Sequence, residues 1–183
     1  MRVLIDACVL YPTVMREVIL GCAALGLFEA KWSARILEEW ARAARKIGPE
    51  GETIARGEIA QVSAKFPGAL VAENAGLEAR LWVPDKNDIH VFASAVAGSC
   101  DAILTLNAKD FPRNILAEEG LLRLDPDGFA VGLLAEAPDQ VRGVAEGVLD
   151  VARQMSGEDW TMRKLMKKAR LPRLGKALEP RAG

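Results

Sequence analysis

The stretch from Pro84 to Pro112 limits the possible folds of this chain more than any other. A carboxylate, Asp88, opens an apolar helix that we predict from Asp88 to Ala97. The next apolar run, Ala102 to Leu106, shows no alternation, as expected of an interior strand of a parallel sheet. A polar turn with a second carboxylate, Asp110, follows the strand. A helix that feeds a buried strand indicates an α/β protein.

Carboxylates recur where predicted strands end. Asp6 closes the first apolar strand, residues 3–5, and Asp110 follows the strand predicted up to Leu106. In open α/β sheets, ligands bind in the crevice at the carboxyl ends of the strands. We therefore expect several acids at one edge of one sheet. Such acids suit a hard cation such as Mg²⁺, which prefers carboxylate oxygen and water.

A third candidate acid lies on a helix that we predict from Trp32-Ser33 to Ile47, with Ser33 as its N-cap. On a helical wheel, Glu38 points away from the apolar side of this helix, whereas Glu39 lies at the edge of that side. A carboxylate at the edge can reach over the rim of a sheet. We therefore select Glu39 as a site residue and expect Glu38 to be a solvated charge.

The rest of the pattern divides the chain near Asp125. Before it we predict helices at 14–25 and 52–66, short strands at 70–71, 81–83 and 121–124, and irregular chain at 73–80. After it the pattern is helical only, at 129–135, 138–155 and 160–178. We expect residues 1–124 to form an α/β domain and residues 125–183 a helical extension.

Charge is distributed unevenly between these parts. From Arg163 onward there are eight basic residues and one acidic residue, whereas residues 1–162 contain 16 basic and 24 acidic residues. A basic segment on an acidic body indicates contact with an anionic partner or with the body itself.

Composition argues against several classes of protein. No run of about 18 apolar residues predicts a membrane span, and the absence of a signal-peptide pattern predicts a cytoplasmic protein. Cys8, Cys22 and Cys100 form no CxxC pair and are expected to be buried thiols. The single histidine, His90, rules out a mechanism that needs two imidazoles, and we expect it to pack in the core.

The order of the acids resembles that of the PIN-domain ribonucleases, especially the VapC-like toxins of bacterial toxin–antitoxin pairs. The family pattern is an Asp that ends the first strand, an acid in a following helix, an Asp that opens a later helix, and an Asn-x-x-Asp-Phe turn after the next strand. The matching residues here are Asp6, Glu39, Asp88 and Asp110. The resemblance covers about residues 2–124, and the helical tail is similar to the C-terminal extension of one PIN subgroup.

The resemblance implies a three-layer α/β/α fold with a central parallel sheet, Mg²⁺ or Mn²⁺ as cofactor, and hydrolysis of RNA phosphodiester bonds. It gives the four matching acids both catalytic and metal-binding roles. It also implies an antitoxin protein as partner, and a homodimer. We assign supporting or phosphate-binding roles to Thr105, Asn107, Asp85 and Arg16. One departure is that many relatives have Thr or Ser beside the first Asp, where this chain has Ala7 and Cys8.

Other readings of these residues stay open at this point. Singly, Asp6 and Asp110 also suit turns, and Asp85 suits an N-cap in front of a first-turn acid, Asp88. A toxin and an RNA-processing nuclease without an antitoxin share every active-site residue. A third alternative is a PIN-like module that binds RNA or protein without cutting. The intact set of four acids argues against that alternative, because acids held close together repel each other unless a cation is bound.

Overall fold

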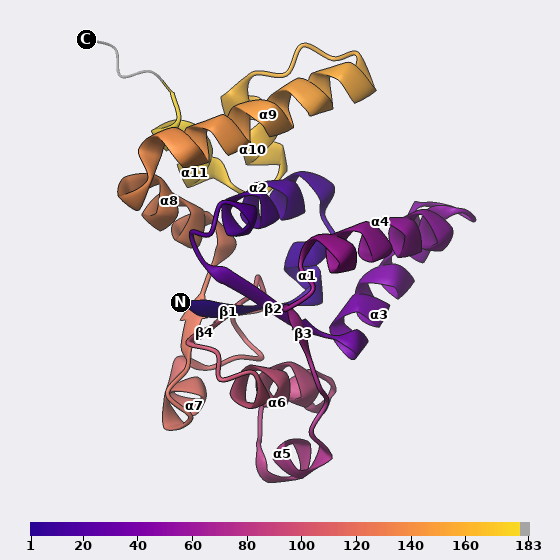
Figure 1. The fold of residues 1–183 in the computed structure, drawn as a ribbon, viewed down its shortest axis with the longest axis vertical. Helices are drawn as coiled ribbons and strands as arrows, with labels where there is room; N and C mark the ends of the chain where they lie inside the picture. The colour runs from indigo at the N-terminus through magenta and orange to yellow at the C-terminus, as the bar shows by residue number, and fades with distance from the viewer. Residues whose placement is uncertain (180–183) are drawn as a thin grey trace. The chain divides into compact units, whose positions relative to one another are not determined.

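The computed structural model describes residues 1–179, and this part of the chain contains a five-stranded sheet with the order β3-β2-β1-β4-β5 (Figure 1). Every neighbouring pair of strands is parallel, so all the carboxyl ends lie at the same edge. This confirms the predicted α/β class with a parallel sheet. The strands are β1 (Arg2–Ile5), β2 (Glu29–Ser33), β3 (Leu70–Val71), β4 (Ala102–Leu104) and β5 (Leu122–Leu124).

The strand order places a topological switch point between β1 and β4. The chain adds β2 and β3 on one side of β1 and then returns to add β4 and β5 on the other side. Ile5 pairs with Leu104, and the backbone N–H of Asp6 donates to the carbonyl of Leu104 at 3.1 Å. The residues that follow β1 and β4 therefore lie side by side where ligands bind in sheets of this kind.

The chain forms two compact units. Unit 1 consists of Met1–Tyr11 and Phe28–Leu124, and unit 2 consists of Pro12–Leu27 together with the chain from Asp125 onward. Unit 1 contains the sheet and the helices α1 (Ala7–Leu10), α3 (Ala34–Ala43), α4 (Gly51–Lys65), α5 (Ala75–Arg80), α6 (Ile89–Ala97) and α7 (Arg113–Glu118). Unit 2 contains α2 (Thr13–Ala24), α8 (Pro126–Glu136), α9 (Pro138–Ser156), α10 (Met162–Lys168) and α11 (Pro172–Ala177).

The division at residues 124 and 125 falls where the sequence pattern changes, but α2 groups with the C-terminal helices and not with residues 1–124. An apolar helix face shows that a helix is covered without showing which segment covers it, so periodicity alone does not reveal this grouping. Among residues 1–179, no helix combines the length and the apolar character needed to cross a membrane.

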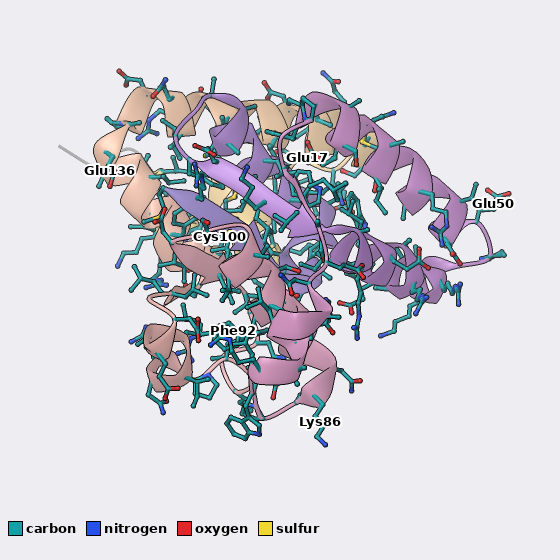
Figure 2. The ribbon with its side chains drawn as sticks, turned by 60° about the horizontal axis from the view of Figure 1, so that its bottom comes forward. Glu17, Glu50, Lys86, Phe92, Cys100 and Glu136 are labelled. Carbon is teal, nitrogen blue, oxygen red and sulfur yellow. The ribbon has the colours of Figure 1, made fainter. Side chains whose placement is uncertain are left out.

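The core of unit 1 lies between the sheet and α6. Ile5 and Ile103, in the two strands at the switch point, are fully buried, and α6 packs against β1, β2 and β4. Phe92 of α6, labelled in Figure 2, is 1 % exposed. Figure 1 shows α5 beside α6, with α1, α3 and α4 clustered elsewhere around the sheet. Burial of α6 along the sheet fixes the position of Asp88, the residue in front of this helix.

Strand β2 is the main element that the sequence pattern missed. We predicted a helix from Trp32-Ser33, whereas Glu29–Ser33 forms a strand between β1 and β3, and α3 starts at Ala34. Ser33 is nevertheless the N-cap, because its hydroxyl accepts from the N–H of Ile36 at 3.3 Å. Five residues carry little periodicity, and pairing with neighbouring strands decides their conformation.

Two local predictions before α6 were also wrong. Ala75–Arg80 is a helix and not irregular chain, and the side chain of Asn74 caps it by accepting from the N–H of Leu77 at 3.0 Å. Leu81–Val83, predicted as a strand, has no strand partner in the described sheet. The sequence could have indicated the start of α5 at Asn74, since Asn is a favoured N-cap residue.

The last predicted helix, 160–178, is two helices. The break comes between α10 and α11, where Arg170 adopts a left-handed conformation with φ of 61°. Pro172 then starts α11, and a proline restricts the residue before it to non-helical conformations.

Candidate metal centre

Asp6 is held at the end of β1 by two side-chain donors. Its Oδ2 accepts from the Thr105 hydroxyl at 2.6 Å and from the Cys8 thiol at 3.0 Å, and the residue is 8 % exposed. Burial, and then the negative charge of Asp6, raise the pKa of the Cys8 thiol to about 12. The thiol is therefore protonated near neutral pH and acts as a donor that holds the carboxylate.

Thr105, to which we assigned a supporting role, supplies a hydroxyl beside Asp6 where the sequence neighbours of Asp6, Ala7 and Cys8, have none. It comes from the end of β4, 99 residues further along the chain, because β1 and β4 are neighbours. The same oxygen accepts from the backbone N–H of Asn107 at 2.9 Å. Short-range sequence comparison misses this contact, because it depends on strand order.

The turn after β4 brings an amide between two carboxylates. The Nδ2 group of Asn107 donates to Oδ2 of Asp88 at 3.2 Å and to Oδ2 of Asp110. An amide NH₂ has two hydrogens, so one side chain serves both acids. Asn107 thereby offsets part of the repulsion between Asp88 and Asp110 and fixes their separation.

Asp85 and Asp88 have different roles in the segment before α6. The Asp85 carboxylate accepts from the N–H of Asn87 at 2.9 Å and so caps a 3₁₀ turn at Lys86–Asp88. Lys86, at the start of this turn, points away from the rest of the chain in Figure 2. Asp88 makes no side-chain capping bond to α6, so its carboxylate remains directed to other groups.

Three of these carboxylates are close enough to share one ion. Within residues 1–179, one oxygen each from Asp85, Asp88 and Asp110 form a group whose members lie within 4.8 Å of one another. From the sequence we assigned Asp85 only a supporting role. Asp6 and Glu39 are not members of this group of three, although the charge of Asp6 raises the pKa of Asp88 more than that of Asp85 does.

The charges of the other four acids nevertheless all affect the pKa of Asp88. Burial, followed by the charges of Asp6, Asp110, Asp85 and Glu39 in that order of size, raises the pKa of the Asp88 carboxyl to about 6. Charges influence a pKa in this way only at short range. The acids chosen from the sequence therefore converge on one carboxylate.

Glu39 approaches the site from α3. Its Oε1 lies 2.8 Å from Nε2 of His90 and 3.7 Å from Nε of Arg35. His90 is 2 % exposed, as expected of a core histidine, yet neither ring nitrogen has a hydrogen-bond partner among the described residues. The contact with Glu39 is thus close but lacks hydrogen-bond geometry.

Glu38 is not the solvated charge that the helical wheel predicted. Its side chain is 34 % exposed, against 36 % for Glu39, and its oxygens pair with Arg56 at 2.9 Å and Arg42 at 3.0 Å. The hydrogen bond from Arg56, followed by that from Arg42, holds the pKa of Glu38 below its usual range. Arg56 comes from α4, and a wheel of α3 alone cannot include it.

Arg16 lies in unit 2, on α2, and not among these acids of unit 1. The residue is 2 % exposed, and its Nε lies 3.3 Å from Oε1 of Glu17. Its assignment as a phosphate contact assumed an exposed side chain. That assumption was wrong, and the phosphate role remains only a prediction.

The donor set fits a hard divalent cation. The grouped donors are carboxylate oxygens, and the nearby thiol of Cys8 is protonated and directed at Asp6. Oxygen ligands with few protein contacts suit Mg²⁺ and Mn²⁺, whereas zinc sites favour imidazole and thiolate. The arrangement can hold such an ion where the strands β1 and β4 end.

Comparison with known proteins yields a family match. The model of the family described as "PIN domain" matches residues 2–109, more than half of the chain. Asp6, Glu39 and Asp88 lie inside the matched segment, and Asp110 directly follows it. No curated protein and no solved structure matches the chain.

Proposed function

Because this chain belongs to the PIN domain family, whose members are generally metal-dependent nucleases that act on RNA, we propose that it is an endoribonuclease that hydrolyses RNA phosphodiester bonds. The observation that carries the proposal is the convergence of five carboxylates on Asp88 at the switch point of the sheet, counting Asp88 itself. We assign catalysis to Asp6, Glu39, Asp88 and Asp110, with Asp85 as a supporting acid.

Mg²⁺ or Mn²⁺ is the proposed cofactor. Asp88 and Asp110 would hold it, with Asp85 beside them and Asp6 and Glu39 completing the negative surroundings. A bound divalent ion supplies positive charge that stabilises the phosphate in the transition state and makes water a better nucleophile.

The protein's own groups keep the acids in place. Thr105 and Cys8 fix Asp6, and Asn107 fixes Asp88 against Asp110. Glu39 has no such donor at hydrogen-bond geometry, so we assign its Oε1 to accept the proton from the attacking water. Water attacks phosphorus, the bond from phosphorus to O3′ breaks, and O3′ takes a proton from solvent, so the products are a 5′-phosphate and a free 3′-hydroxyl.

The products test this chemistry. We expect cleavage to leave 5′-phosphate and 3′-hydroxyl ends, to stop in EDTA, and to continue on an RNA with one 2′-deoxy nucleotide at the scissile position. Water, and not the 2′-hydroxyl, is the nucleophile, so that hydroxyl contributes only to recognition. His90→Ala, if folded, should keep most of the activity. End-labelled RNA and mass spectrometry of the fragments provide the measurement.

Two outcomes would contradict the mechanism. A 2′,3′-cyclic phosphate product means that the 2′-hydroxyl attacked, and cleavage that persists in EDTA means that no metal is needed. A preparation of Asp6→Asn, purified in the same way, detects contaminating ribonuclease, because any activity it retains does not come from this site.

The raised pKa of Asp88 predicts that stability depends on pH in the metal-free protein but not in the metal-loaded protein. A carboxyl with a folded-state pKa of about 6 stabilises the fold below its unfolded value, and this contribution is lost as the pH rises through about 6. Raising the pH from 5 to 7.5 should cost the metal-free protein about 1–2 kcal/mol, allowing for solvent screening. Saturating Mn²⁺ should remove this loss, because the ion binds the ionised acid.

Thermal melts at pH 5 and 7.5, with and without MnCl₂, measure both effects. Asp88→Asn is the matched control, since it removes the titrating group and should flatten the pH dependence of the metal-free protein. Equal pH dependence in the variant and the original chain would exclude Asp88 as its source.

We also propose that the protein is the toxin of a toxin–antitoxin pair, acting in the cytoplasm, with an antitoxin protein and a second copy of itself as partners. The support is the similarity of the Pro84–Pro112 stretch to VapC-like toxins. An RNA-processing nuclease without an antitoxin is the alternative. The neighbouring gene separates them: a small DNA-binding protein that co-purifies and blocks cleavage supports the toxin, and its absence supports the alternative.

A further inference from the structure

Unit 2 carries a basic surface that the proposed active site does not use. We call it the α10 surface, and it consists of the exposed side chains of Arg163, Lys164, Lys167, Lys168 and Arg170. The opposite side of α10 is apolar and buried, through Leu165 and Met166. All of its charged positions therefore face solvent while the helix stays anchored.

Most of this charge has no counter-charge. Within residues 1–179, Arg163 pairs with Glu179 at 2.9 Å, whereas Lys164, Lys167 and Arg170 have no acidic group within ion-pair distance. Like charges crowded in this way repel each other, and an anionic partner relieves that repulsion. The surface is thus a candidate for binding a polyanion.

Arg173, on α11, has a structural role and contrasts with the residues of the α10 surface. It pairs with Asp125 at 2.5 Å and Asp127 at 3.2 Å, and Asp127 also accepts from two backbone N–H groups at the start of α11. The α10 residues have no comparable set of contacts. Among these described residues, Arg173 therefore holds the fold, whereas Lys164, Lys167 and Arg170 are available to bind an anion.

An aromatic ring lies next to this surface. Trp160 precedes α10, its indole N–H donates to the Ser156 hydroxyl at 3.1 Å, and the ammonium of Lys168 lies 4.7 Å from the ring centroid. Trp160 and Lys168 both line a hollow of about 340 Å³, with Met15 and Leu165 among its other walls. The ring is held in place, and a base in the hollow would meet the indole and a cation together.

We propose that the α10 surface and the Trp160 hollow form a site for single-stranded RNA outside the catalytic centre. Lys164, Lys167 and Arg170 bind phosphates, and one unpaired base stacks on Trp160 beside Lys168. Proteins that bind single strands combine a basic track with aromatic platforms in this way. The inference rests on the proposed function in taking RNA as the substrate, and it adds a second binding site, in unit 2, for phosphates other than the scissile one.

An acidic protein segment is the rival occupant. It would suit the lysines, but a carboxylate does not stack, so the indole ring in the hollow would have no part in binding it. Stacking also favours single strands over a duplex, whose bases are paired and stacked already.

The test compares two double reversals with the same change in net charge. Lys164→Glu/Lys167→Glu alters the α10 surface, and Lys46→Glu/Lys65→Glu alters exposed positions in unit 1. Binding of a 20-nucleotide single-stranded RNA is measured in EDTA, where cleavage is stopped, over a range of salt. We expect the α10 variant to bind at least about tenfold more weakly and its log–log salt slope to fall by about 1.4, or 0.7 for each phosphate that is no longer neutralised. The control should change less than about twofold.

A third variant examines the ring. Trp160→Leu should lower affinity by about tenfold with an unchanged salt slope, because stacking releases no counterions. Circular dichroism melts of each variant exclude unfolding. Equal weakening in the two double variants would overturn the inference, since net charge alone would then explain binding. Retained RNA affinity in the α10 variant, with loss of binding to a glutamate-rich peptide, would also overturn it and assign the surface to an acidic protein.

Cleavage of a dinucleotide keeps this inference separate from the proposed nuclease, because its single internucleotide phosphate is the one cut and none is left for the α10 surface. If the original chain cuts no RNA but the α10 variant loses RNA binding, the surface stands and the proposed activity fails. If dinucleotide cleavage is normal and all variants bind long RNA equally, the activity stands and the surface is refuted.

Discussion

Asp88→Asn is expected to lower the rate of RNA cleavage by at least about a thousandfold and to abolish stabilisation by Mn²⁺. The charges of the other acids all raise the pKa of Asp88, which indicates that they surround this carboxylate. Asparagine has nearly the same shape as aspartate but lacks the negative charge that a divalent ion needs. For the original chain, Mn²⁺ at a hundred times its Kd adds about 2.7 kcal/mol to the free energy of unfolding, or about 5–10 °C in Tm for a chain of this size. Initial rates and thermal melts with and without metal give both quantities.

A matched variant separates the site from general acidity. Asp150→Asn removes the same charge from an exposed position on α9, where the side chain is 66 % exposed, and should change neither the rate nor the Mn²⁺ shift. An Asp88→Asn protein that still gains stability from Mn²⁺ would show that the ion binds elsewhere. Full activity in the same variant would remove Asp88 from the mechanism.

Glu39→Gln and Glu38→Gln should differ in activity by about a hundredfold or more, although the residues are neighbours with almost equal exposure. Glu39 acts on Asp88 and contacts His90, and loss of a general base costs about 10²–10⁴ in rate. Glu38 is held by Arg56 of α4 and by Arg42 of its own helix, so its loss should slightly lower Tm and leave cleavage within about twofold.

Single-turnover rates at saturating RNA measure the chemical step, and melts measure the fold. Because both substitutions are nearly isosteric, neither should unfold the chain. Equal losses of rate in the two variants, or a loss confined to Glu38→Gln, would show that the acceptor of the proton has been assigned to the wrong acid.

Interior strands and strand-end acids were the predictable part of the fold. The apolar run that became β4 and the strand that ends before Asp6 are buried almost throughout, so composition alone marks them as interior. Asp88 and Asp110 follow from their positions beside such elements. The four acids remain an assignment from sequence, supported by their convergence on Asp88.

Individual contacts between distant segments were not predictable, although a supporting role for Thr105 was expected. Thr105 reaches Asp6 only because β4 pairs with β1, and Glu38 loses its solvated character only because α4 brings Arg56 against α3. The short strand β2 depends in the same way on its neighbours. In each case the deciding partner is far along the chain, where local periodicity carries no information.

The membership of α2 in unit 2 has a consequence for biosynthesis. The helix leaves the ribosome early, but the helices it packs with, α8 and α9, are translated only after Asp125. Apolar residues of α2, such as Val18 and Ile19, therefore lack the packing of α8 and α9 during most of translation. Chaperones bind nascent chains in this period. A gene fragment that stops at Leu124 would leave this helix permanently without those partners. Expression trials of the catalytic part alone therefore call for redesign of the apolar positions of α2, while residues 12–27 stay in place because they belong to the crossover between the parallel strands β1 and β2.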